Sequence, residues 1–201
     1  MRKERSDILC ITNRSLCKGD FLTRIEAIAR ERPAAIVLRE KDLPRDAYAS
    51  LAAEVSAICR SYRIPCVYHS FVETALAQGA NAIHLPLWGM RELSPEAKRH
   101  FSVIGVSCHS VEEAKEAEEL GCTYITAGHI FEPECKKGLP GRGLTFLESV
   151  CRAVCVPVYG IGGINPENAR LVRDTGAYGI CVMSTLMQCE DVGDCMRKYG
   201  A

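Results

Sequence analysis

The feature that most constrains this chain is a repeated alternation of short apolar segments with amphipathic ones along all 201 residues. The apolar segments are rich in Ile, Val and Cys and lack a clean polar–apolar alternation, which is typical of strands buried on both faces of a parallel sheet. Each is followed by a helix or a short helical turn. Strands are predicted at 7–12, 35–39, 66–68, 82–85, 102–106, 124–127, 157–161 and 179–183.

The segments between the strands carry helical periodicity and helix boundary signals. Apolar residues recur at three- and four-residue steps over 21–32, 48–62 and 111–120. Ser94-Pro95 and Asn165-Pro166 each place a capping side chain before a proline at the first helical position. Ser110 with Glu113 fits a capping box, and Gly79, Gly121 and Gly176 follow predicted helix ends.

Eight strand–helix repeats in about 200 residues predict an α/β fold, a single-domain (β/α)8 TIM barrel over residues 1–201. An open doubly wound sheet is the alternative. The strand count favours the barrel, and so does the lack of a G-x-G-x-x-G turn after the first strand. No linker or low-complexity tract divides the chain.

Composition narrows the classes of partner. Lys plus Arg and Asp plus Glu both number 25, which argues against a general nucleic-acid binder but leaves room for a local basic pocket. No apolar run approaches the roughly 18 residues of a membrane-spanning helix. The charged N-terminal residues lack the apolar stretch of a secretory signal, so we expect a cytoplasmic protein.

Twelve cysteines are present, and their pattern favours a structural interpretation. The chain has no C-x-x-C pair, whereas structural zinc sites usually show tight paired spacings, and disulfide scaffolds are usually much shorter secreted chains. Most of the cysteines lie within apolar runs. We therefore expect small buried hydrophobic residues in a reducing compartment.

In a barrel of this type the active site lies at the C-terminal ends of the strands. Gly162 and Gly163 follow the seventh predicted strand, and Ser184 and Thr185 follow the eighth. Glycines let a backbone approach a ligand, and a helix start offers free N–H groups to an anion, so these residues predict a phosphate site. Tight turns that need glycine are the alternative.

Basic residues follow the second strand. Arg39 and Lys41 suit a carboxylate or a phosphate of a substrate, unless they form a solvated rim paired with Glu40 and Asp42. The 131–143 segment contains Lys136, Lys137 and Arg142, so it could close over an anionic ligand or be only a surface loop.

His129 directly follows the sixth strand and is the main acid/base candidate, although a lone histidine is often a structural hydrogen-bonding group. His109 and His69 are weaker candidates, His84 is expected to pack within the fourth strand, and His100 is expected at the surface. No metal-binding pattern fits: H-E-x-x-H is absent, and no run of carboxylates stands at the strand ends.

Several motifs together resemble the thiamine phosphate synthase superfamily over nearly the whole chain. Within it, Gly128-His129-Ile130-Phe131-Glu132, Cys135-Lys136-Lys137-Gly138-Leu139 and Gly141-Arg142-Gly143 resemble the TenI branch, the thiazole tautomerases. The other segments that carry the resemblance are Ile11-Thr12-Asn13-Arg14, Leu38-Arg39-Glu40-Lys41, Gly79-Ala80-Asn81-Ala82-Ile83-His84-Leu85, Ile104-Gly105-Val106-Ser107-Cys108-His109, Gly160-Ile161-Gly162-Gly163-Ile164 and Met183-Ser184-Thr185.

The chain departs from the synthase pattern at three places. Synthases carry an Asn-Asp pair after the third strand and an Asp after the fourth, which hold magnesium and a pyrimidine diphosphate. Here those stretches begin Tyr68-His69-Ser70 and His84-Leu85-Pro86, without an acidic residue, and Leu38 replaces a Gln. Because magnesium needs oxygen ligands, these departures argue against coupling through loss of diphosphate.

The resemblance therefore implies a thiazole tautomerase, an isomerase that aromatises a carboxylated thiazole phosphate without a metal or other cofactor. His129 would move the proton, Gly162, Gly163, Ser184 and Thr185 would bind the phosphate, and Arg39, Lys41 or Ser107 would hold the carboxylate. A degenerate thiamine phosphate synthase and a non-catalytic regulator that binds a thiamine precursor are the alternatives. The expected partner is the small-molecule thiazole phosphate, with no nucleic acid and no membrane, and a homo-oligomer stays possible.

Overall fold

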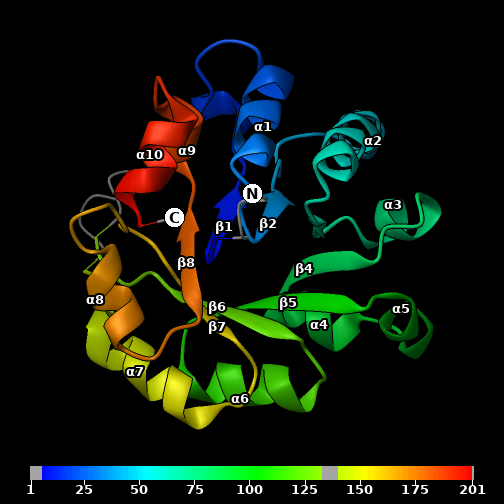
Figure 1. The fold of residues 1–201 in the computed structure, drawn as a ribbon. Helices are drawn as coiled ribbons and strands as arrows, with labels where there is room; N and C mark the ends of the chain where they lie inside the picture. Colours follow the sequence, from blue (N-terminus) through cyan, green and yellow to red (C-terminus); the bar gives the residue numbers. More distant parts are fainter. Residues whose placement is uncertain (1–5, 133–139, 201) are drawn as a thin grey trace. The chain divides into compact units, whose positions relative to one another are not determined.

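The computed structural model of the chain describes residues 6–132 and 140–200. Eight parallel strands follow one another in chain order in a closed barrel, which confirms the predicted (β/α)8 fold class. Helices alternate with these strands along the chain (Figure 1). The strands are β1 (Ile8–Ile11), β2 (Ala35–Leu38), β3 (Cys66–His69), β4 (Ala82–Pro86), β5 (Val103–Cys108), β6 (Tyr124–Gly128), β7 (Val158–Ile161) and β8 (Gly179–Val182).

Eleven helical segments are described. They are η1 (Arg14–Leu16), α1 (Phe21–Arg30), α2 (Arg45–Tyr62), α3 (Val72–Ala77), α4 (Leu87–Glu92), α5 (Pro95–His100), α6 (Val111–Glu119), α7 (Gly143–Ala153), α8 (Ala169–Asp174), α9 (Ser184–Gln188) and α10 (Val192–Lys198).

The boundary signals are confirmed at α5 and partly at α6, and the start of α8 differs. Ser94 caps α5, accepting a hydrogen bond from Ala97 N at 3.2 Å, and Ser110 accepts one from Glu113 N at 3.1 Å. The Glu113 carboxylate bonds His109 N rather than the Ser110 N–H of an ideal capping box.

The helix expected at Asn165-Pro166 begins only at Ala169. Asn165 Oδ1 accepts hydrogen bonds from the backbone N–H groups of Glu167 and Asn168 at 3.1 and 3.0 Å, which closes a local turn before the helix. A short polar side chain of this kind competes with the helical hydrogen bonds and delays the first helical turn.

The residues fall into two compact units. The terminal unit comprises Met1–Ile83 and Val182–Ala201, and the central unit comprises His84–Cys181. The single domain expected over residues 1–201 stays a prediction.

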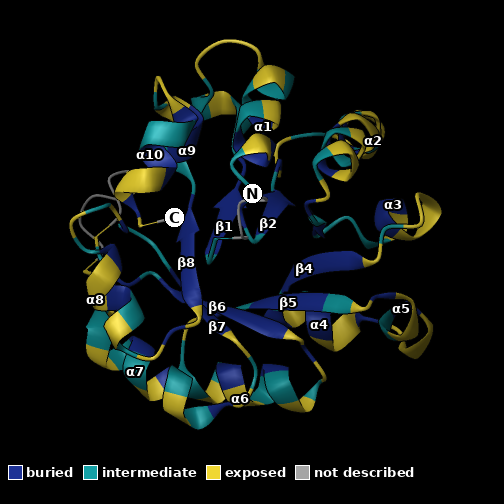
Figure 2. Cartoon of the chain, in the orientation of Figure 1, coloured by how far each residue is buried: buried dark blue, intermediate teal, exposed yellow. Residues whose placement is uncertain are grey.

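In the terminal unit, β2 pairs in parallel with β1 and with β3, with Cys10 opposite Ile36 and Val37 opposite Val67. Helix α1 packs against α2, and α10 packs against α1 and α9. All four residues of β1 and of β2 are buried, as expected for strands covered on both faces (Figure 2).

In the central unit, β5 to β8 pair in parallel, and α6 and α7 pack against each other beside them. The pairing places Gly105 opposite Tyr124 and Ser107 opposite Thr126. Since alternate residues of a strand point to the same face, the side chains of Ser107, Tyr124 and Thr126 share one face of β5 and β6.

The prediction for the cysteines holds for about half of them. Six of the eleven described cysteines are buried, and none of the eleven forms a disulfide. Burial raises the pKa of the Cys108 and Cys122 thiols to about 12, as expected for thiols that pack as small hydrophobic groups. Cys155 is exposed.

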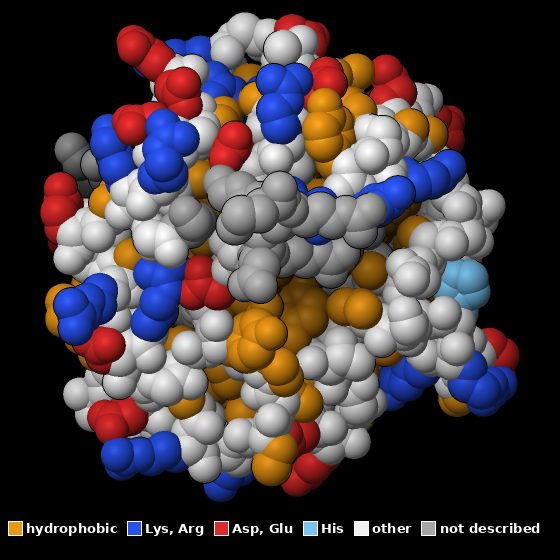
Figure 3. All heavy atoms as spheres, in the orientation of Figure 1, with side chains coloured by type: hydrophobic (Ala, Val, Ile, Leu, Met, Phe, Trp, Pro, Cys, Tyr) orange, Lys and Arg blue, Asp and Glu red, His pale blue; other side chains and the backbone are white. Residues whose placement is uncertain are grey.

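No helix within the described ranges is long and apolar enough to cross a membrane. On the face seen in Figure 3, basic and acidic side chains are interspersed, in keeping with the equal numbers of basic and acidic residues.

Candidate functional site

In the terminal unit, the ends of β1 and β2 are joined through a polar cluster of Thr12 and Glu40, which are buried, with Arg14 and Arg39, which are partly exposed. Thr12 Oγ1 accepts a hydrogen bond from Arg39 N at 2.9 Å and donates one to Glu40 Oε1 at 2.6 Å. Arg14 N donates to both oxygens of the Glu40 carboxylate, at 3.1 and 3.0 Å. The cluster fixes the backbone at Arg39, one of the predicted substrate-binding residues.

Arg14, and not Arg39, binds the carboxylates of Glu40 and Asp42. The Arg14 guanidinium lies 3.9 Å from Glu40 Oε2 and also forms an ion pair with Asp42. In the alternative considered from the sequence, Glu40 and Asp42 would pair with Arg39 and Lys41. Among the described residues, none forms an ion pair with the Arg39 side chain, so its guanidinium could bind an anionic ligand, and Lys41 is exposed.

Glu40 itself is only 1% exposed. Burial raises the pKa of its carboxyl group, and the hydrogen bonds from Thr12 and from Arg14 N, together with the Arg14 charge, oppose that shift. Its contacts to Thr12 and Arg14 indicate a role in holding the ends of β1 and β2.

Ser184 and Thr185, also in the terminal unit, are the first two residues of α9, and both are half-buried. The preceding residue, Met183, makes no side-chain capping hydrogen bond to this short helix. Tyr199 Oη donates to Thr185 Oγ1 at 3.2 Å.

In the central unit, Gly162 and Gly163 follow β7 with φ angles of +100° and +65°, which favour glycine. A Cβ atom on Gly162 would lie 2.4 Å from His129 Cβ. Backbone hydrogen bonds from Ile130 N to Ile161 O at 2.9 Å and from Phe131 N to Gly162 O at 3.0 Å join the two segments. Tight packing thus supplies one reason for these glycines, and their phosphate-binding role stays a prediction.

The structure brings His129 against this glycine turn. Its Nε2 atom is buried and has no hydrogen-bond partner among the described residues. An orphaned buried polar atom is costly, so a ligand atom or a water bonded there would stabilise this arrangement. His109 Nδ1 lies 2.8 Å from Gly128 O, directly before His129 in the chain.

The central unit also contains a set of hydrogen-bonded polar side chains around His84, which the sequence did not predict. His84 Nε2 lies 2.8 Å from Ser107 Oγ, and His84 Nδ1 lies 2.9 Å from Tyr124 Oη. Ser107 was a predicted binding residue, whereas His84 was expected only to pack. The available signal was the presence of His84, Ser107 and Thr126 in otherwise apolar strands.

The remaining histidines have local roles. His69, in the terminal unit, is buried with Nδ1 2.8 Å from Ser70 Oγ. His100 is exposed, as expected, and its ring packs edge-on against Phe101. Lys136 and Lys137 of the predicted closing loop lie outside the described residues.

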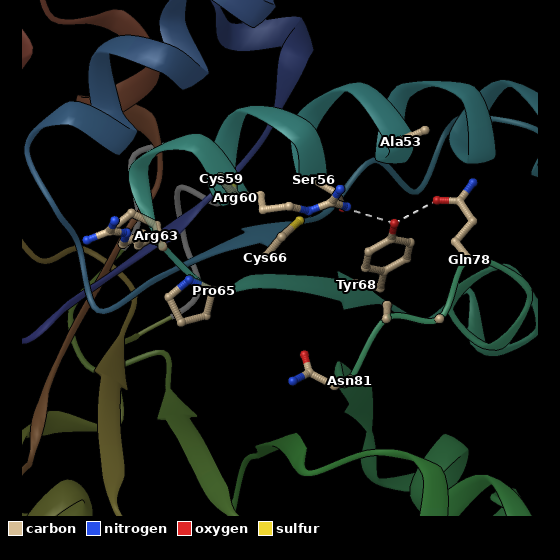
Figure 4. A pocket seen from close by; sticks show the side chains of 13 residues that line it. Ala53, Ser56, Cys59, Arg60, Arg63, Pro65, Cys66, Tyr68, Gln78 and Asn81 are labelled. Carbon is tan, nitrogen blue, oxygen red and sulfur yellow. Dashed lines mark hydrogen bonds between the residues drawn. The ribbon is translucent and has the colours of Figure 1, made fainter.

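A cavity of about 730 Å³ lies in the terminal unit, between the second half of α2 and the start of β3 (Figure 4). Its hydroxyl groups are already paired: Tyr68 Oη bonds Ser56 Oγ at 3.0 Å and Gln78 Oε1 at 2.7 Å. Because it is at the N-terminal end of β3, opposite the end where barrel active sites lie, we do not assign the active site to it.

The described residues do not offer a metal site. Over 6–132 and 140–200, no group of three or more His, Cys, Asp or Glu side chains is placed to hold an ion. Glu73, in the first turn of the helix that follows β3, is paired with Arg45 at 2.5 Å. Directly after β4 come Leu87 and Trp88, which carry no oxygen ligand.

Comparison with known proteins gives a consistent result. Residues 8–186 match the family described as thiamine monophosphate synthase. The chain is 35% identical to thiamine-phosphate synthase of Clostridium acetobutylicum, covering 93% of this chain and 90% of the relative, and 32% identical to thiamine-phosphate synthase 2 of Streptococcus pneumoniae, covering 96% and 92%. Among solved structures, thiamine phosphate pyrophosphorylase of Pyrococcus furiosus is similar, with a TM-score of 0.82, 30% identity and coverage of 96% and 93%.

These relatives overturn one prediction. The tautomerase interpretation, which makes the chain an isomerase, is wrong, because the curated relatives that match over most of the chain are named as synthases. The catalytic role expected of His129 stays a prediction. The error has a chemical origin. The absence of acidic residues after the third and fourth strands argues against magnesium binding, but it does not show that the chain catalyses a proton transfer rather than a coupling reaction.

Proposed function

Because the chain belongs to the thiamine monophosphate synthase family, we propose that it is a thiamine-phosphate synthase, a transferase that couples a pyrimidine diphosphate to a thiazole phosphate with loss of diphosphate. The observation that carries this proposal is the 35% identity to the Clostridium acetobutylicum synthase over 93% of the chain. The similarity runs through both compact units, so it is not the property of one shared motif.

Both substrates of such a reaction are phosphorylated, and each unit supplies groups suited to phosphoryl oxygens. The terminal unit offers the Arg39 guanidinium, Lys41, and Ser184 and Thr185 at the start of α9. A guanidinium can bind two phosphate oxygens at once, and charge-assisted hydrogen bonds of this kind are about twice as strong as neutral ones.

The central unit offers Ser107 and the turn at Gly162 and Gly163. We assign these residues to phosphoryl binding as well, with the orphaned Nε2 atom of His129 as a further polar contact for the substrate. Since diphosphate leaves carrying negative charge, donors that are already in place would stabilise that charge as it develops.

The magnesium that the synthase resemblance implies does not fit the described residues. Its expected ligands follow the third and fourth strands, where Ser70 and Pro86 stand here and where Glu73 is paired with Arg45. We therefore derive no step through a metal. This disagreement favours a second candidate function, the binding of a thiamine precursor without turnover.

One experiment separates the two functions. The purified chain is incubated with the pyrimidine diphosphate and the thiazole phosphate, with and without Mg²⁺, and 31P NMR follows the release of diphosphate and the formation of thiamine phosphate. The Clostridium acetobutylicum synthase serves as the positive control. Equal amounts of the two products are expected for a synthase.

Substrate binding measured by calorimetry completes the test. Binding of either phosphorylated substrate without product would refute the synthase and support precursor binding. Neither product nor binding would refute both functions.

A further inference from the structure

Four polar side chains in the central unit form one hydrogen-bonded network, which we call the Ser107 network: His84 on β4, Ser107 on β5, and Tyr124 and Thr126 on β6. His84 Nδ1 lies 2.9 Å from Tyr124 Oη, and His84 Nε2 lies 2.8 Å from Ser107 Oγ. Thr126 Oγ1 donates to Ser107 Oγ at 3.3 Å and lies 3.5 Å from His84 Nε2.

The strand register and one glycine create the space for this network. Gly105 stands opposite Tyr124, and Ser107 stands opposite Thr126. A Cβ atom at position 105 would lie 2.1 Å from Tyr124 Cζ and 2.4 Å from His84 Nδ1. The contact between the imidazole and the phenol therefore depends on the missing side chain of Gly105.

The direction of the hydrogen bonds follows from counting protons. Tyr124 is 7% exposed, and burial raises the pKa of its phenol well above the ordinary value, so the phenol keeps its proton. Among the described residues, His84 Nδ1 is the one hydrogen-bond partner of Tyr124 Oη. Because a buried donor without an acceptor is costly, Tyr124 donates to Nδ1.

The rest of the network follows from this first bond. With Nδ1 accepting, a neutral imidazole carries its proton on Nε2 and donates it to Ser107 Oγ. The Thr126 geometry agrees independently. Thr126 Oγ1 donates its single proton to Ser107 Oγ, so the contact of Thr126 with Nε2 also needs a proton on Nε2.

Ser107 Oγ thus accepts from two donors, and the Ser107 proton is left without an acceptor among the residues that the structure describes. Ser107 is half-buried near the C-terminal end of β5, the end at which barrel enzymes bind their substrates. A hydroxyl group whose lone pairs are occupied in this way can act only as a donor toward a ligand.

We propose that Tyr124 and His84 are positioning residues that fix the Ser107 hydroxyl as a hydrogen-bond donor to a phosphoryl oxygen of the bound substrate. The choice of a phosphoryl group rests on the proposed function. The direction of the network rests on the structure alone, so the two can fail separately.

The first test reads the tautomer of His84 by 15N NMR of the imidazole nitrogens in the ligand-free chain. The proton is expected on Nε2, with Nδ1 unprotonated. In Tyr124→Phe the two tautomers are expected to mix, because Nδ1 loses its donor. Tyr68→Phe, which removes a buried phenol from β3 of the other unit, is the matched control and should leave the tautomer unchanged. A proton on Nδ1 in the unmodified chain would overturn the proposal.

The second test measures the affinity for inorganic pyrophosphate by calorimetry, in buffer without divalent cations. Ser107→Ala is expected to weaken binding about 10- to 100-fold, the usual range for a hydrogen bond to a charged group. Tyr124→Phe is expected to weaken it about twofold, because equal tautomers halve the fraction of molecules that are ready to bind.

Two substitutions of His84 distinguish positioning from packing. The side-chain amide of His84→Gln can still donate to Ser107, so this variant is expected to bind pyrophosphate more tightly than His84→Leu. Equal weakening by the two variants, or unchanged affinity in a folded Ser107→Ala, would overturn the proposal. If these affinities and the tautomer follow expectation while no thiamine phosphate forms, the synthase function fails and the positioning role stands.

Discussion

Thr12 holds the ends of β1 and β2 together through a single hydroxyl group, and Thr12→Val tests that role with little change of shape. The side chain is fully buried, so valine fills the same space without leaving a cavity. The substitution removes the 2.9 Å bond from Arg39 N and the 2.6 Å bond to Glu40.

The expected cost follows from those two bonds. The bond to the Glu40 carboxylate is charge-assisted, and the Arg39 N–H is left without its acceptor, while Glu40 keeps its bonds from Arg14 N. Together the losses should lower the free energy of unfolding by about 2–4 kcal/mol. For a chain of this length that corresponds to a melting temperature about 5–15 °C lower.

Urea denaturation followed by circular dichroism measures this change. Thr12→Ser keeps the hydroxyl and is the control, with the smaller loss expected from removing one methyl group, about 1 kcal/mol. Combining Thr12→Val with Glu40→Gln should cost less than the sum of the separate changes, because the two residues share one bond. A Thr12→Val protein within about 0.5 kcal/mol of the unmodified chain would refute the argument.

Four further predictions concern the site and the thiols. Arg39→Ala should weaken binding of the phosphorylated substrates about 10- to 100-fold, measured by calorimetry, and Arg39→Lys should lose less; no loss in either would remove Arg39 from the site. Gly105→Ala should lower the free energy of unfolding by about 3 kcal/mol or more in urea denaturation, because its Cβ atom would overlap the Tyr124 ring, and a cost below about 1 kcal/mol would contradict that packing. Burial raises the pKa of the Glu40 carboxyl group in the folded state, so the contribution of this group to the free energy of unfolding falls as the pH rises through its folded-state pKa. Urea denaturation across the acidic range should show this fall in the unmodified chain, and Glu40→Gln should not show it. Of the eleven cysteines that the structure describes, Cys155 should react first with a thiol reagent under native conditions, and a buried one of these that reacts as fast would contradict the burial found here.

The sequence predicts the positions of the strands well because burial on both faces leaves a strong local signal. All eight predicted segments overlap the observed strands, and their ends differ by at most two residues. The start of α8 was missed because Asn165 bonds two nearby backbone N–H groups, a local competition that the pattern Asn-Pro does not reveal.

The Ser107 network could not be predicted because it depends on register. Ser107 and Thr126 come into contact because the pairing of β5 and β6 places them opposite each other. His84 reaches them because position 105 has no side chain. Each residue by itself resembles an ordinary polar position within a strand. The ion pairs of Arg14 with Glu40 and Asp42 also depend on how the ends of β1 and β2 meet.

The packing of Gly162 against His129 restricts how this protein can be redesigned. The space for a side chain at position 162 is already filled by the Cβ atom of residue 129, and two backbone hydrogen bonds keep the neighbouring segments in register. A laboratory selection for a new substrate that places other residues at position 162 will therefore find few folded variants. Libraries that keep glycine at position 162 and vary the side chain at position 129 explore the part of sequence space in which this turn still forms, because the atoms that fill the space at position 162 are the Cβ and the backbone of residue 129.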